Sequence, residues 1–82
     1  MKVTVKFFSS LMEYLPADAA DNAVDIVQAG PVSPNQVLER YKIPEAEVQT
    51  MMVNGVFLPP EKRDDPLSDG DTLTVWPALQ GG

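Results

Sequence analysis

Both ends of the chain show the alternation of apolar and polar side chains that is typical of a β-strand. Residues 2–8 and residues 72–76 each place every second side chain on one face of an extended segment. The apolar positions on that face are Val3, Val5, Phe7, Leu73 and Val75. Because 82 residues form one small domain, we predict a single sheet-based domain over residues 1–82.

Three further strands are predicted in the middle of the chain. Residues 24–28 are rich in β-branched side chains, and residues 50–53 and 56–58 flank the dipeptide Asn54-Gly55. Asn-Gly is the strongest two-residue signal for a hairpin, because both residues adopt positive φ at low cost. Two prolines follow the second hairpin strand, and they suit a strand at the edge of a sheet.

Two short helices are predicted from capping boxes at residues 10–13 and 33–36, the second with proline at its first helical position. Pro16 and Pro44 are expected to end them. The apolar face of the second helix consists of Val37, Leu38 and Tyr41. Helices this few cannot cover both faces of a sheet. The pattern therefore predicts an α+β fold, with one mixed sheet of about four to five strands and a short helix packed across one face.

The composition excludes several classes of function. The sequence contains no Cys and no His, so it has no thiol nucleophile, imidazole base, disulfide or structural zinc site. Twelve acidic and six basic side chains give a net charge of −6, which repels nucleic acid and anionic membranes. No apolar run approaches the roughly 20 residues of a membrane span. We therefore expect a cytoplasmic protein with no autonomous catalytic site, no metal and no stably bound cofactor.

Gly81 and Gly82, the last two residues, form the most informative candidate site. A C-terminal carboxylate, with a pKa of about 3.5, is ionised and is a poor electrophile at neutral pH. It becomes reactive once it is activated, for example as an anhydride with AMP, and the chain has no Gly-rich phosphate loop of its own for this step. Glycine lacks a Cβ atom, so its backbone can enter a narrow channel of an activating enzyme. A frayed, idle terminus is the alternative.

Four stretches of the chain carry a resemblance to a known family. They are residues 5–11 (VKFFSSL), 53–55 (VNG), 67–73 (LSDGDTL) and 76–82 (WPALQGG). In this order, and with Gly-Gly as the final pair, they resemble the ubiquitin-like β-grasp sulfur carriers. Within that family the chain is most similar to the small subunit of molybdopterin synthase, and the carrier of the thiamine pathway is a close relative.

The resemblance implies a β-grasp fold, a flexible Gly-Gly tail and a reaction sequence at Gly82. An E1-like adenylating enzyme, using ATP and Mg²⁺, would adenylate the Gly82 carboxylate, and a persulfide sulfur donor protein would replace AMP to leave a thiocarboxylate. The recipient would be a precursor held by a large synthase subunit, in molybdopterin biosynthesis, or by a thiazole synthase-like acceptor. A ubiquitin-like modifier conjugated through Gly82, and an interaction module with an idle tail, are the alternatives.

A partner surface is predicted beside the tail. Phe8 and Trp76 fall on the face opposite the inward residues of their strands, and the first and last strands are neighbours in a β-grasp fold. The two aromatic rings would then form an exposed apolar patch of the kind found at protein interfaces. Alternatively, a long loop covers Phe8, and Trp76 packs locally. The predicted partner-binding residues are Phe8, Trp76, Pro77, Ala78, Leu79, Gln80 and Gly81.

Residues 61–66 are predicted to form a solvated loop, and residues 68–71 a turn. Four aspartates in these segments form an acidic cluster, namely Asp64, Asp65, Asp69 and Asp71. They either steer a basic partner or belong to solvated turns, and we favour the turns.

Overall fold

The computed structural model describes residues 1–78. In chain order the elements are β1 (Lys2–Phe7), η1 (Ser9–Tyr14), β2 (Ala23–Val27), α1 (Pro34–Arg40), η2 (Glu45–Glu47), β3 (Val48–Val53), β4 (Val56–Leu58), η3 (Pro60–Lys62) and β5 (Thr72–Pro77). The elements labelled η are 3-10 helices. All five predicted strands are present, and β3 begins two residues before the predicted start.

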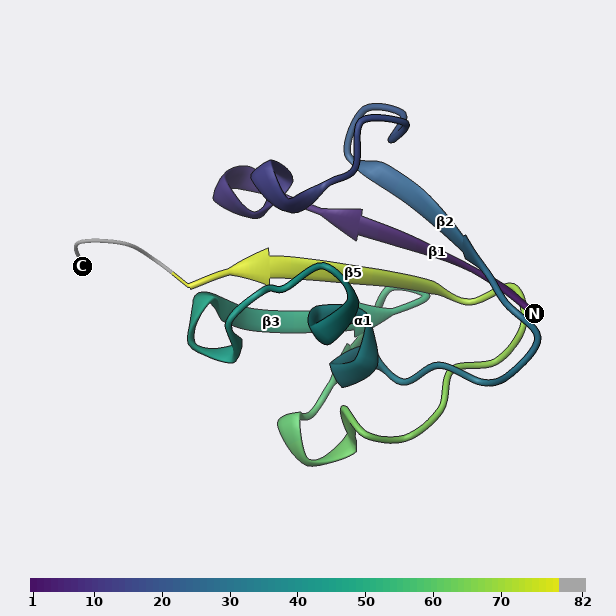
Figure 1. Cartoon of the computed structure of the whole chain (residues 1–82). Coiled ribbons are helices and arrows are strands. Elements are labelled where there is room, and N and C mark those ends of the chain that lie inside the picture. The colour runs from purple at the N-terminus through teal and green to yellow at the C-terminus, as the bar shows by residue number, and fades with distance from the viewer. Residues whose placement is uncertain (79–82) are drawn as a thin grey trace.

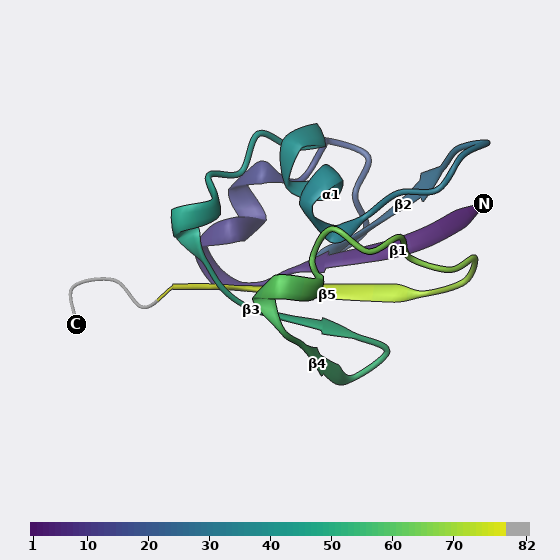
Figure 2. The same ribbon diagram turned by 90° about the horizontal axis from the view of Figure 1, so that it is seen from below.

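The five strands form one mixed sheet in the order β2-β1-β5-β3-β4. The central strands β1 and β5 run parallel, and the other neighbours are antiparallel. Figure 1 shows α1 lying across this sheet, and Figure 2 shows α1 and η1 on the same side of it. The predicted α+β architecture, including β4 at the edge before its two prolines, is confirmed.

The core lies between the sheet and α1. The alternating positions of β1 and β5 face it, and their side chains are fully buried, as predicted. The other fully buried apolar side chains are Leu11, Ile26, Pro34, Val37 and Met51. Phe7 meets the ring of Tyr41 edge to face, with ring centroids 5.5 Å apart. Strand alternation therefore determines which face of the sheet becomes apolar.

The two predicted capping boxes have different outcomes. At α1, the Ser33 hydroxyl accepts the backbone N–H of Gln36, while the Gln36 side chain accepts the backbone N–H of Ser33. The prediction of a capping box at residues 10–13 is wrong, because η1 has Phe8 as its N-cap and no side-chain cap bond. Ser9 takes a positive φ of 50°. The chain therefore turns into the helix two residues early, and Ser10 lies inside it rather than before it.

The end of α1 also differs from the prediction. The helix ends at Arg40, and Lys42 adopts a φ of 59°, so the chain has left the helical conformation before it reaches Pro44. The left-handed residue acts as the stop that we had assigned to the proline. No helix in residues 1–78 is long and apolar enough to span a membrane.

The loop at residues 61–66 is not solvated throughout, and this prediction is wrong at Arg63. Only 5% of Arg63 is exposed, and its guanidinium donates a hydrogen bond of 3.4 Å to the Gln49 carbonyl. Its own carbonyl accepts the backbone N–H of Asn35 at 2.9 Å. The loop is therefore folded against α1 and β3, with the aliphatic stem of the arginine covered.

Candidate functional site at the end of β5

The candidate site is built around the end of β5. Figure 1 shows that η1 and η2 flank this end of the strand. Four predicted site residues fall within the described chain, namely Phe8, Trp76, Pro77 and Ala78. The predicted Gly-Gly tail and the other site residues lie outside the described residues, and they are Leu79, Gln80, Gly81 and Gly82.

Phe8 and Trp76 lie together on the face of the sheet opposite α1, which we call the open face. The parallel register pairs Phe7 with Val75, so the next residues of the two strands are neighbours that point the other way. Their rings are stacked with centroids 4.0 Å apart and planes 8° from parallel. Trp76 keeps 37% of its surface exposed. The aromatic pair expected for an exposed patch is therefore present. Because Trp76 stacks on Phe8, Trp76 also has the local packing that the alternative expected.

Two further apolar side chains, Met52 and Phe57, lie on the open face. The antiparallel registers pair Met52 with Thr74 on one side and with Phe57 on the other. Phe57 is 57% exposed. Sequence reasoning assigned Phe57 to a strand but not to this surface. The alternation in β3 and β4 contained that signal, because the Asn-Gly turn fixes which residues share a face.

The backbone that follows Trp76 is fixed at two points. Pro77 pairs with Val48 at the start of β3, and the Ala78 N–H donates a hydrogen bond of 2.9 Å to the Glu47 carbonyl. The register of β3 against β5 shifts between Val48 and Thr50, which forms a bulge next to this point. Bulges re-aim a strand and are frequent beside functional sites. The structure thus sets the direction in which the chain leaves the sheet.

Tyr14 and Glu47 were missed by the sequence analysis. The Tyr14 hydroxyl, at the end of η1, donates a hydrogen bond of 2.6 Å to the Glu47 carboxylate, at the end of η2. This hydrogen bond and the adjacent negative charges raise the pKa of Tyr14 to about 12. The pair is separated by 33 residues, so local pattern held no signal for it.

The opposite end of β5 is fixed by carboxylates. Asp71 accepts hydrogen bonds from the Ser68 backbone and from the Asn54 side chain, at 2.8 and 2.9 Å. Asp69 accepts the backbone N–H of Lys2 at 2.7 Å. These two acidic residues act as acceptors that close the turn, as the favoured interpretation requires.

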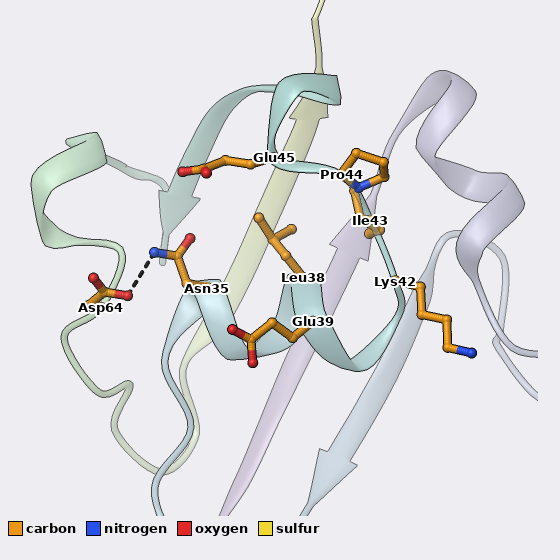
Figure 3. A pocket seen from close by; sticks show the side chains of 8 residues that line it. All are labelled: Asn35, Leu38, Glu39, Lys42, Ile43, Pro44, Glu45 and Asp64. Atoms are coloured by element: carbon orange, nitrogen blue, oxygen red, sulfur yellow. Dashed lines mark hydrogen bonds between the residues drawn. The ribbon is translucent and has the colours of Figure 1, made fainter.

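A groove lies on the other side of the sheet, beside α1 (Figure 3). It has a volume of about 420 Å³, and its floor contains Leu38 and Ile43. Asp64 at its rim accepts a hydrogen bond from Asn35, and the side chain of Lys42 points away from it. No group of three metal-ligating side chains occurs within residues 1–78.

Comparison with protein families identifies the family to which the chain belongs. The model of the Mut7-C ubiquitin family matches residues 1–81. The chain belongs to the Mut7-C ubiquitin family. No curated protein matches this member in sequence.

Solved structures resemble this Mut7-C ubiquitin chain over nearly its whole length. SAMP1 from Haloferax volcanii superposes with a TM-score of 0.66 at 16% identity, with 100% of both chains covered. A putative molybdopterin converting factor subunit 1 from Pyrococcus furiosus gives 0.65 at 22%, covering 95% of this chain and 98% of that one. The thiamine biosynthesis protein ThiS from Geobacter metallireducens gives 0.62 at 23%, with 100% of both chains covered. The predicted ubiquitin-like β-grasp family and fold are confirmed.

Proposed function

We propose that this chain is a sulfur carrier that is loaded at Gly82. The Gly82 carboxylate attacks the α-phosphorus of ATP on an E1-like enzyme with Mg²⁺, and pyrophosphate leaves. The terminal sulfur of a persulfide on a donor protein then attacks the acyl adenylate, and AMP leaves. A second thiol of the donor reduces the resulting acyl disulfide. The products are the Gly82 thiocarboxylate and a disulfide on the donor.

One observation carries this proposal: a β-grasp chain places an aromatic pair and a fixed strand end directly before a Gly-Gly sequence. Ala78 is hydrogen-bonded to η2, and Gly81 and Gly82 follow it by three and four residues. Four extended residues span at most roughly 14 Å. A partner that docks on Phe8 and Trp76 can therefore receive Gly82 in a nearby active site, while glycine admits close approach to a nucleotide.

As recipient we propose a precursor of molybdopterin that is held by a large synthase subunit. The support is the similarity to the Pyrococcus protein, whose name describes a converting-factor subunit. Transfer to a thiazole synthase-like acceptor is the second candidate, favoured by the likeness to ThiS. The protein that copurifies with the chain from its own cells distinguishes the two.

Alkylation of protein isolated from its own cells tests the loading step. Sulfur in place of oxygen adds about 16 Da, which methionine oxidation mimics, and the chain has four methionines. A thiol-selective alkylating agent avoids this ambiguity, since the chain has no Cys. We expect one adduct on the wild-type chain, located at Gly82 by fragmentation.

A variant with one alanine appended after Gly82 is the matched control, and it should carry no adduct. High-mass conjugates that disappear when Gly82 is deleted would replace the carrier with a protein modifier. A wild-type chain with neither adduct nor conjugates, in cells that contain the adenylating enzyme, would leave only an interaction module.

A further inference from the structure

Glu47 contacts two different parts of the molecule at the end of β5. Its backbone carbonyl accepts the N–H of Ala78 at 2.9 Å. Its carboxylate accepts the hydroxyl of Tyr14 at 2.6 Å. The first contact holds the last described residue of the chain, and the second ties η2 to η1. We call these three residues the clasp.

The clasp brings together elements that the sheet alone does not connect. In Figure 1, η1 and η2 lie on either side of the end of β5. The η2 helix has only three residues and no side-chain cap bond, so it has little stability of its own. A hydrogen bond from Tyr14 to a charged acceptor restrains it, because such bonds are stronger than neutral ones.

The chemistry of the pair suits a restraint that persists at neutral pH. The pKa of Tyr14 is raised to about 12 by its hydrogen bond to Glu47. The phenol therefore keeps its proton and remains the donor. Arg63 braces the adjoining start of β3, because its guanidinium donates to the carbonyl of Gln49 at the bulge.

We propose that Tyr14 and Glu47 are positioning residues that fix Ala78 as the point from which the loaded tail departs. This inference rests on the proposed function. Four residues follow Ala78 in the sequence, and each adds roughly 3.3–3.6 Å of reach. Release of Ala78 would lengthen the reach by about one residue. It would also add a segment that must be ordered when the partner binds.

Amide hydrogen exchange tests the clasp without any partner. In Tyr14→Phe we expect the Ala78 amide to exchange at least roughly tenfold faster, the effect of a lost hydrogen bond to a charged group. The Val75 amide should be unchanged. Glu47→Gln keeps an acceptor oxygen but loses the charge, so its Ala78 exchange should fall between wild type and Tyr14→Phe, whereas Glu47→Ala should behave like Tyr14→Phe.

Tyr41→Phe is the matched control, since the Tyr41 hydroxyl has no hydrogen-bond partner within residues 1–78. It should leave Ala78 exchange unchanged. Equal exchange at Ala78 in wild type and Tyr14→Phe would overturn the clasp.

Deletion of Leu79 tests the role of the clasp in loading. In an otherwise wild-type chain the deletion shortens the reach by about 3.5 Å, and we expect the alkylatable fraction to fall at least tenfold. In the Tyr14→Phe background, release of Ala78 should restore part of that loss. Tyr41→Phe should restore none. A merely structural Tyr14 would instead give losses that add or worsen.

Equal losses on Leu79 deletion in all three backgrounds would overturn the proposed positioning role. An unloaded wild-type chain would overturn the proposed function and, with it, the positioning role. Ala78 exchange would still report whether the hydrogen bonds hold the strand end, so the two failures are distinguishable.

Discussion

The two faces of the sheet are made by the same strands but have different surroundings. On the α1 face, the alternating side chains of β1 and β5 are fully buried. On the open face, the adjacent positions carry lysine, threonine and one stacked aromatic pair. Phe7 and Phe8 show the contrast in neighbouring residues, since one packs in the core and the other lies on Trp76.

This difference separates the requirements of folding from those of recognition. The covered face must match α1 in shape, so it tolerates little change. The open face contributes less to stability and can carry a partner surface. Along β1 and β5 the aromatic pair is the exception to the polar character of this face, and it lies where the chain leaves β5. Folding does not require apolar side chains on the open face, yet the aromatic pair lies there beside the end of β5. This position favours a role for the pair in partner binding.

Alanine at the two adjacent phenylalanines should give the largest contrast. Phe7→Ala removes a fully buried ring and should lower the free energy of unfolding by about 3–5 kcal/mol. That is a large share of the roughly 5–15 kcal/mol typical of a small domain. Phe8→Ala loses mainly the stack with Trp76 and should cost about 1 kcal/mol. Urea unfolding followed by far-UV circular dichroism measures both.

Loading of Gly82 with sulfur provides a second contrast between the two phenylalanines. Phe8→Ala should remain folded, yet its alkylatable fraction should fall about tenfold, because interface aromatics carry much of the binding energy. Equal unfolding costs for the two variants would remove the distinction between the faces. Normal loading of folded Phe8→Ala would exclude the aromatic pair as a partner contact.

Most of the fold could be predicted because it depends on short-range rules. Alternation located β1 and β5, and the Asn-Gly turn located the β3–β4 hairpin with φ values of 52° and 82°. The Ser33 box succeeded because it is a local pattern, and both of its hydrogen bonds form between Ser33 and Gln36. The Ser10 box failed because the φ of Ser9 decides where η1 begins, and that angle depends on how the chain leaves β1.

The candidate site could be predicted only in part, for a related reason. Phe8 and Trp76 followed from strand alternation and from the expected neighbour relation of the first and last strands. Tyr14, Glu47 and Arg63 could not be found, because their contacts join distant segments. A buried arginine within a charged, proline-flanked stretch looks like a solvated loop until α1 and β3 are placed against it.

Replacing the serines of the two predicted caps with alanine sharpens the comparison on the covered side, with a smaller effect. Ser33→Ala removes the hydroxyl that accepts the Gln36 N–H and should lower the free energy of unfolding by about 1 kcal/mol. Ser10→Ala is the matched change at a position without a cap bond and should cost only a few tenths of that. Denaturant midpoints at constant m-value compare the two. Equal costs would mean that the cap of α1 does not contribute to holding the helix over the core.

The smallest expected effect belongs to the polar part of the open face. The Thr4 hydroxyl donates to the Asp25 carboxylate at 2.8 Å, and this bond, aided by Lys2, holds the pKa of Asp25 below its usual value. A lowered folded-state pKa contributes stability above the unfolded value of about 3.9 and loses it as the pH falls through the folded value. Asp25→Asn should therefore be slightly less stable than wild type at pH 7, and the difference should shrink as the pH falls below the unfolded value. Because Lys2 and Asp25 are exposed, solvent keeps the contribution small.

Thr74→Val is the control, because Thr74 lies on the same face without a side-chain bond to Asp25, and its stability should show no such pH dependence. A stability difference between wild type and Asp25→Asn that stays constant from pH 7 to pH 2 would assign the effect to packing. The open face would then resemble the covered one more closely than its exposure indicates.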